Sequence, residues 1–173
     1  MVLNNYYAWR TFCDNYTYVQ YDERSPITTG IRDTTNTAII LNISGGGYAT
    51  DVLPHLKNYS LGNGFSVKLG EGITDPEAED YTMEADITSY LVSYNCNYTM
   101  GVTDTGQKSV VITVTGVNNN SNTITISELG IFKSFYDFQG STKNAMMVHE
   151  LLDAPITLNH GQSFSLTFEW IES

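Results

Sequence analysis

The end of the chain carries a regular alternation of apolar and polar residues. Between residues 163 and 170, large apolar side chains occupy every second position, namely Phe164, Leu166, Phe168 and Trp170. Successive side chains of a β-strand point to opposite faces, so this pattern predicts a strand with one buried face and one face in water. A half-exposed strand of this kind is typical of an antiparallel sheet.

A longer alternating segment lies near the middle of the chain. Between residues 90 and 100, the even-numbered positions hold Tyr90, Val92, Tyr94, Cys96, Tyr98 and Met100. We expect the hydrophobic core to be drawn from these positions and from the even-numbered positions of 164–170. Cys96 then lies on the apolar face, where a free cysteine behaves as a small hydrophobic residue.

Turn-forming residues separate several shorter β-rich runs. These runs are residues 38–43, 65–69, 110–115, 123–126 and 146–152. The asparagine-rich run 118–122 predicts a hairpin between the third and the fourth of them, and residues 159–162 predict a turn in which Gly161 takes a positive φ. Together these features predict an all-β fold, an antiparallel β-sandwich with little helix, of which a jelly roll is one form.

One position breaks the strand period. Ile124 and Ile126 share their parity with Glu128, whereas Leu129 has the other parity. A β-bulge near Ser127-Glu128 would repair this register. Glu128 is then expected to be at least partly buried and to accept hydrogen bonds from backbone N–H groups, because a buried carboxylate needs partners. The alternative is a solvent-facing glutamate on a regular strand.

Aromatic residues are concentrated near the N-terminus without a regular period. They are Tyr6, Tyr7, Trp9, Phe12, Tyr16, Tyr18 and Tyr21. Either this segment closes one end of the core, or it is an arm that docks on a neighbouring subunit, since Tyr and Trp are enriched at interfaces. Residues 22–37 are polar and predict a connection. The predicted organisation is an N-terminal arm and connection (1–37) followed by one β-sandwich domain (38–173).

Charge excludes some classes of partner. The chain has 173 residues, enough for one domain, with 8 basic against 19 acidic residues and a net charge of −11. Such a surface repels nucleic acid and anionic membranes, so neither is expected as a partner. No apolar run approaches the ~20 residues of a membrane span, and the first residues lack signal-peptide features. We therefore expect synthesis in a cytosol, with Cys13 and Cys96 as free thiols.

Candidate chemistry is sparse. Acidic residues crowd into residues 71–86, namely Glu71, Asp75, Glu77, Glu79, Asp80, Glu84 and Asp86. Their spacing lacks the alternation of a calcium loop, so a solvated acidic loop is expected. His55, His149 and His160 show no metal-ligand spacing, and nothing around the two cysteines indicates a nucleophile. We therefore expect no enzyme, cofactor or metal site.

Two groups of short motifs suggest a family. The first contains Gly70-Glu71-Gly72, Pro76 and Asp80-Tyr81-Thr82-Met83-Glu84. The second contains Ile126-Ser127-Glu128-Leu129-Gly130-Ile131-Phe132, Pro155-Ile156-Thr157-Leu158 and Gly161-Gln162. These motifs resemble those of small virion structural proteins of tailed bacteriophages, over residues 68–173. The aromatic N-terminus and Asp153, which has no nearby arginine, depart from that family's pattern.

The resemblance implies a β-sandwich used as a building piece of the particle, without catalytic residues. We therefore expect a non-enzymatic accessory or decoration protein of the capsid, neck or tail, made in the host bacterial cytoplasm and then part of the virion. Its expected partners are other virion proteins and further copies of itself, because closed homo-oligomers are common. The alternative is a glycan- or receptor-binding module at a fibre or tail tip, and a third interpretation is a glycan hydrolase.

Overall fold

The computed structural model describes residues 4–8, 26–42, 65–106, 108–136, 139 and 141–171. The strands in chain order are β1 (Pro26–Arg32), β2 (Ala38–Asn42), β3 (Phe65–Gly70), β4 (Leu91–Val102), β5 (Lys108–Asn118), β6 (Ile124–Tyr136), β7 (Thr142–Leu158) and β8 (Ser163–Ile171). Helix is confined, within these ranges, to residues 4–8 and the 3-10 turn η1 (Thr88–Tyr90). No helix there is long and apolar enough to cross a membrane.

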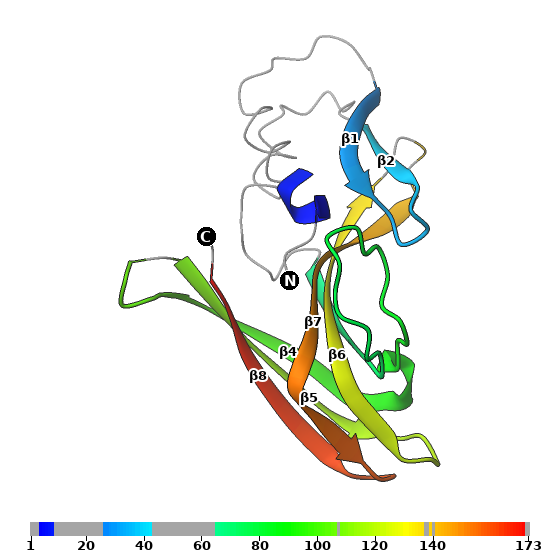
Figure 1. The fold of residues 1–173 in the computed structure, drawn as a ribbon, viewed down its shortest axis with the longest axis vertical. Coiled ribbons are helices and arrows are strands. Elements are labelled where there is room, and N and C mark those ends of the chain that lie inside the picture. The colour runs from blue at the N-terminus through cyan, green and yellow to red at the C-terminus, as the bar shows by residue number, and fades with distance from the viewer. Residues whose placement is uncertain are drawn as a thin grey trace.

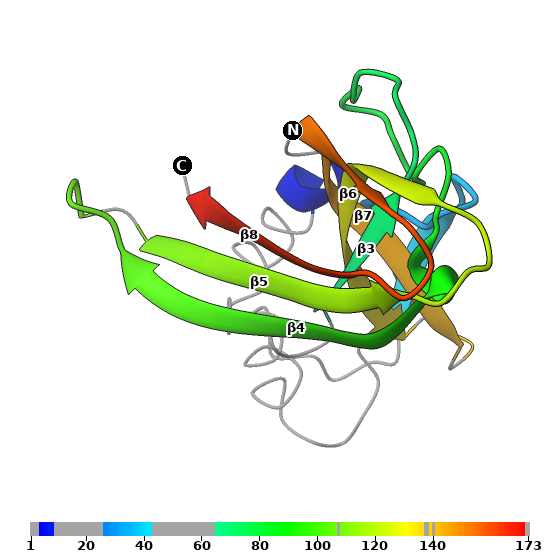
Figure 2. The same ribbon diagram turned by 90° about the horizontal axis from the view of Figure 1, so that it is seen from below.

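All strand pairs are antiparallel, as predicted. One sheet has the order β3-β6-β7, a second has the order β4-β5-β8, and β1 and β2 form a separate pair. Figures 1 and 2 show strands β4, β5 and β8 running together beside the β3-β6-β7 sheet. The prediction of an all-β antiparallel fold is confirmed, while the assignment to a β-sandwich or jelly roll stays a prediction.

The second half of the chain forms a two-stranded ribbon that is folded across both sheets. β6 pairs with β7 in one sheet, and β5 pairs with β8 in the other. The predicted hairpin at residues 118–122 is therefore wrong, because the strands that flank it belong to different sheets. This run instead turns a corner beside residues 159–162, where Gly161 has the predicted positive φ of 79°.

Asn118 holds this corner together. Its side chain is fully buried, and its Nδ2 donates to the carbonyl oxygens of Leu158 at 2.9 Å and Asn122 at 3.0 Å. Its Oδ1 accepts the backbone N–H of Asn120 at 2.8 Å. Its own N–H donates to the carbonyl of Gln162. One asparagine thus joins the two connections of the folded ribbon.

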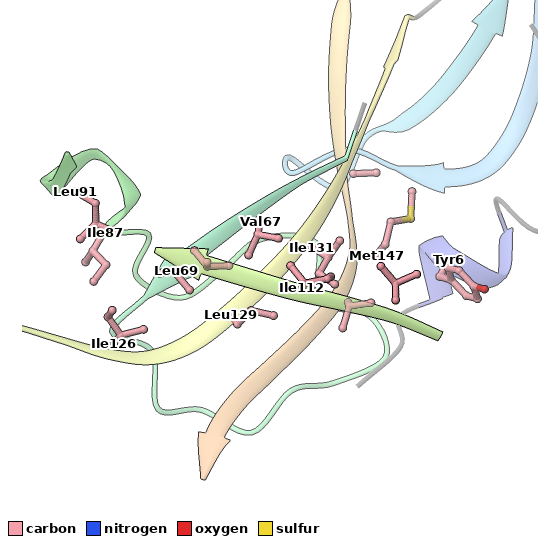
Figure 3. Packing of buried hydrophobic residues seen from close by; sticks show 14 of the residues in the cluster. Tyr6, Val67, Leu69, Ile87, Leu91, Ile112, Ile126, Leu129, Ile131 and Met147 are labelled. Atoms are coloured by element: carbon pink, nitrogen blue, oxygen red, sulfur yellow. The ribbon is translucent and has the colours of Figure 1, made fainter. Parts of the chain in front are cut away.

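The main core cluster joins buried side chains of both three-stranded sheets, and Tyr6 near the N-terminus also belongs to it (Figure 3). Its fully buried members include Leu69 on β3, Ile126 and Ile131 on β6, and Ile112 on β5. Full burial of such a side chain contributes about 1.5–3 kcal/mol. Tyr94 on β4 adds a polar link between the sheets, because its hydroxyl donates to the carbonyl of Val67 on β3 at 2.9 Å.

The core positions predicted between residues 90 and 100 are correct from Tyr94 to Tyr98 but not before Tyr94. Tyr94, Cys96 and Tyr98 pack against the core, but Tyr90 and Val92 are exposed. The register with β5 shifts between Val92 and Asn95, where Ser93 has a positive φ of 51°. This irregularity reverses the parity, so Leu91 rather than Val92 faces the core. On β8, Phe164, Leu166 and Phe168 face the core as predicted.

The predicted register break at Glu128 is confirmed. Ile126 pairs with Ile156, but Glu128 pairs with Leu151, so the extra residues lie on β7. They include Pro155, which has no N–H to donate to a ladder. β7 is consequently longer than the predicted strand 146–152.

β1 lies inside the segment predicted to be a connection. It pairs with β2 across the predicted boundary at residue 37. Pro26 and Gly30 suggested a break, whereas the β-branched residues between and after them favour a strand. The connection assigned to residues 22–37 is therefore corrected to include a strand.

Removing the side chain of Asn118 should destabilise the corner. In Asn118→Ala, two carbonyl groups and one N–H group of the corner lose their partner, and we expect the free energy of unfolding to fall by about 2–4 kcal/mol. Asn119→Ala, at an exposed neighbour, should change it by less than about 0.5 kcal/mol. Urea unfolding midpoints measure both, and similar midpoints for the two variants would contradict the role of Asn118.

Candidate functional site

Of the predicted interface residues, the structure describes Tyr6 and Tyr7. Tyr6 is 4% exposed and belongs to the core, whereas Tyr7 is 51% exposed. Their rings meet edge to face, with centroids 5.7 Å apart. Tyr6 thus helps to close the chain's own core. The other predicted interface residues, Trp9, Phe12, Tyr16, Tyr18 and Tyr21, lie outside the described residues, as does Cys13.

A buried polar cluster forms where the loop of residues 71–86 covers the outer face of the β3-β6-β7 sheet. At its centre Glu128, on the middle strand β6, has no solvent exposure. Its Oε1 accepts the N–H groups of Gly72 at 3.1 Å and Ala85 at 2.9 Å. Its Oε2 accepts the N–H of Glu84 at 3.2 Å. The predicted burial of Glu128, with backbone N–H partners, is confirmed.

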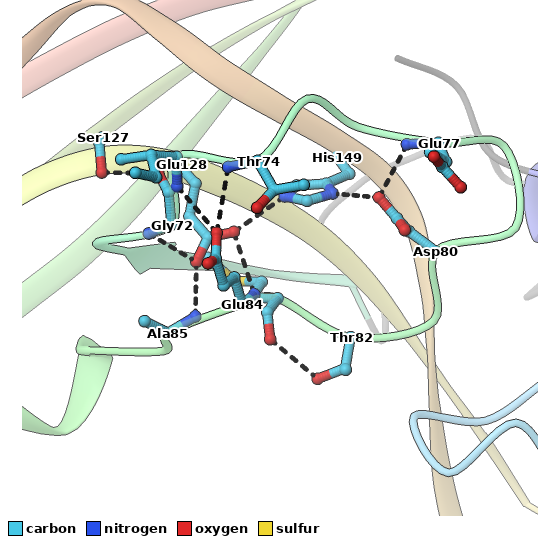
Figure 4. A network of polar contacts seen from close by, with 12 residues as sticks. Gly72, Thr74, Glu77, Asp80, Thr82, Glu84, Ala85, Ser127, Glu128 and His149 are labelled. Atoms are coloured by element: carbon cyan, nitrogen blue, oxygen red, sulfur yellow. Dashed lines mark hydrogen bonds and ion pairs between the residues drawn. The ribbon is translucent and has the colours of Figure 1, made fainter.

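His149 extends this cluster toward the surface (Figure 4). It lies on β7, and its side chain is 5% exposed. Its Nε2 is 2.8 Å from Oε2 of Glu128, and its Nδ1 is 2.7 Å from Oδ2 of Asp80. Asp80 also accepts the backbone N–H of Glu77. The imidazole therefore bridges a buried carboxylate and a partly exposed one.

Both ring nitrogens of His149 are engaged, because Nε2 contacts Glu128 and Nδ1 contacts Asp80.

Two glycines leave the space that the Glu128 carboxylate occupies. A Cβ atom on Gly72 would lie 2.5 Å from Cδ of Glu128 and 2.6 Å from its Oε2. A Cβ atom on Gly70 would overlap Oε1 of Glu128 and the carbonyl oxygen of Ala85. The Gly-x-Gly pair therefore accommodates a carboxylate of its own chain, and a side chain at either position would displace it.

The carboxylates of the acidic loop bind the loop's own backbone. Glu84 accepts the N–H groups of Ile73 and Thr74, and these bonds lower the pKa of its carboxyl group. Asp86 receives Lys68 Nζ at 2.7 Å. The predicted acidic loop is solvent-exposed along most of its length, but several of its charges have fixed hydrogen-bond partners.

A small apolar cluster lies beside the polar one. Met83 of the loop packs with Phe132 of β6 and Met146 of β7. A Cβ atom on Gly130 would lie 2.7 Å from the Phe132 ring and 3.0 Å from the sulfur of Met83. Apolar packing and buried hydrogen bonds together hold the loop against the sheet.

The arrangement suits structural stabilisation better than catalysis. Both oxygens of Glu128 and both nitrogens of His149 contact groups of the same chain and are shielded from solvent. A general base must come within hydrogen-bond reach of its substrate, and in this cluster the hydrogen-bonding positions are occupied by groups of the same chain. Among the described residues, no group of three or more His, Cys, Asp and Glu side chains is arranged to hold a metal ion.

Comparison with known proteins gives no relative. No family model matches the chain, and neither a curated protein nor a solved structure matches it.

Loss of the Glu128 carboxylate should be strongly destabilising. Glu128→Ala leaves buried N–H groups without an acceptor, and we expect the free energy of unfolding to fall by about 3–5 kcal/mol. Glu128→Gln keeps one carbonyl acceptor and should cost about 1–2 kcal/mol. Glu77→Ala, on the exposed side of the loop, should stay within about 0.5 kcal/mol of wild type. Denaturant midpoints test this order, and three equal midpoints would contradict it.

Gly72 and Glu128 should be energetically coupled. Gly72→Ala places a methyl group where the carboxylate lies, so it should destabilise the chain by about 1–3 kcal/mol. In a Glu128→Ala background that space is free, and the same substitution should cost much less. A double-mutant cycle on unfolding free energies should therefore give a coupling of about 1–3 kcal/mol. If the effects of the two substitutions on the unfolding free energy were strictly additive, Gly72 would not be needed to make room for the Glu128 carboxylate.

Proposed function

We propose that this chain is a non-enzymatic structural component of a tailed-phage virion, an accessory protein of the head, neck or tail. It acts through protein–protein contacts with other virion proteins and with copies of itself. It is made in the host bacterial cytoplasm and functions in the assembled particle. The observation that supports this proposal is the Glu128–His149–Asp80 cluster, whose polar atoms are engaged by groups of the same chain.

The same cluster explains which residues carry the resemblance to virion proteins. Gly70, Gly72, Asp80, Glu84 and Glu128 belong to the quoted motifs, and each contributes space or hydrogen bonds to the loop's attachment. These are fold-determining positions. A structural building block functions through its shape, so we expect its family motif to consist of residues that maintain the fold.

The surface charge supports contacts with a basic partner. The chain has a net charge of −11, and most acidic residues of the loop 71–86 are exposed. Complementary charges accelerate association and exclude partners of like charge. A basic surface on a larger virion protein would therefore be a suitable docking site for this loop.

The glycan-binding alternative has weaker support. Sugar-binding surfaces present aromatic rings next to polar groups. Among the residues whose side-chain exposure the structure describes, the exposed large aromatic residues are Tyr7 and Tyr90, which lie on separate elements. They do not form a common platform.

Analysis of purified particles tests the proposed function. Quantitative mass spectrometry of particles from the phage that encodes this chain should find it at a fixed copy number, and antibody labelling should place it on the head, neck or tail. Absence from the particles would overturn the proposal. Restriction to a fibre tip, together with saturable glycan binding, would favour the alternative.

A further inference from the structure

The two three-stranded sheets differ in how their edges are covered. In the β3-β6-β7 sheet, the edge of β3 that faces away from β6 is hydrogen-bonded to the end of the acidic loop. For example, the N–H of Ile87 donates to the carbonyl of Leu69 at 2.9 Å. The edge of β7 is bonded by Thr34 N–H to the carbonyl of Asn144, and by Asn5 Nδ2 to that of Met146. Other segments of the chain therefore occupy both edges.

No segment in the described part of the chain covers the edges of the β4-β5-β8 sheet in this way. β5 is its central strand, and within the described residues nothing is hydrogen-bonded to the outer edge of β8. β8 pairs with β5 in an unbroken register from Ser163 to Ile171, so the backbone groups on its other side form a regular row that no other described segment pairs with. Such an edge is a template for another strand unless charges, prolines or bulges prevent pairing.

β8 has almost none of these protective features. It contains no proline, lysine or arginine, and its single charged residue is Glu169. β4, at the opposite edge, is interrupted by the irregularity at Ser93, which weakens it as a pairing edge. Of the two open edges, β8 is therefore better suited to accept a strand.

We infer that β8 is a self-association edge, at which the β8 strands of two copies pair antiparallel and join their sheets into one continuous sheet. The inference rests on the proposed structural function and specifies one of its partners, a second copy of this chain. Main-chain hydrogen bonds supply the affinity, as they do wherever a strand is added to a sheet edge. A two-fold axis at Thr167 aligns the full length of both strands.

The side chains of β8 are compatible with this register. Leu166 lies opposite Phe168 of the second copy, so apolar residues meet on the inner face. Glu169 lies opposite Ser165 of the second copy, so the two glutamates do not face each other. Two chains of net charge −11 repel each other. This repulsion is smallest where the contacting surfaces carry few charges, and β8 contributes only Glu169 from each copy.

A pair of lysine substitutions tests the edge. Asn97 on β4, Thr113 on β5 and Thr167 on β8 form one row across the outer face of the sheet. Thr167→Lys places like charges opposite each other at the two-fold axis and should weaken dimerisation by about a hundredfold. Asn97→Lys, in the same row at the other edge, should leave the dimer intact.

Sedimentation velocity over a range of concentrations measures the dimer, and circular dichroism confirms that both variants are folded. A monomeric wild-type chain would overturn the inference. So would equal behaviour of the two variants, or loss of the dimer only in Asn97→Lys.

Disulfide cross-linking tests the register independently. Chains carrying Ser165→Cys and chains carrying Glu169→Cys are mixed, both in a Cys13→Ser, Cys96→Ser background, and oxidised mildly. Residues directly opposite on antiparallel strands are close enough for a disulfide, so the mixed dimer should cross-link far more than either chain alone. Equal cross-linking in all three samples would overturn the proposed register.

These results are separable from the test of the proposed function. A monomeric chain that is nevertheless found in particles removes the β8 contact and leaves the virion function in place. A dimer that pairs through β8 but is absent from particles would confirm the β8 contact and overturn the virion function.

Discussion

Burial of the Glu128 carboxylate constrains everything around it. A carboxylate without solvent must receive hydrogen bonds, and the loop 71–86 supplies three backbone N–H donors, while His149 of β7 contacts the same carboxylate. Once the loop supplies its N–H groups, it must lie against the sheet, Gly72 must lack a side chain, and His149 must point toward the Glu128 carboxylate. Loop, sheet and histidine therefore form one cooperative unit, and a change at any of them affects the others.

The sequence indicates this unit only in part. The conflict in parity around Glu128 is visible within a few residues, so its burial and the register break could be predicted. Its partners Gly72, Glu84 and Ala85 lie more than forty positions earlier, and no local pattern links them to it. His149 was missed for the same reason, because a single histidine on a strand gives no sign of the two carboxylates that meet its ring nitrogens.

The contrast between local patterns and long-range contacts also explains why most strands were predictable while the connection at residues 118–122 was not. Alternation identifies β8 and most of β4, because side-chain period is a local property. The asparagine-rich run looks like a hairpin loop in sequence, since both flanking segments alternate as hairpin arms do. What distinguishes a corner is the long-range bond from Asn118 to the carbonyl of Leu158, which no local pattern encodes.

The folded ribbon also dictates an order of events during synthesis. β6 pairs with the strand that follows it, but β5 must wait for β8, which is synthesised after β6 and β7. Pairing over such a sequence separation is slow, and until it occurs β5 has an open edge beside the apolar residues Ile112 and Val114. Completion of the β4-β5-β8 sheet therefore requires the C-terminal strand, so a chain that stops before residue 163 keeps that edge unpaired.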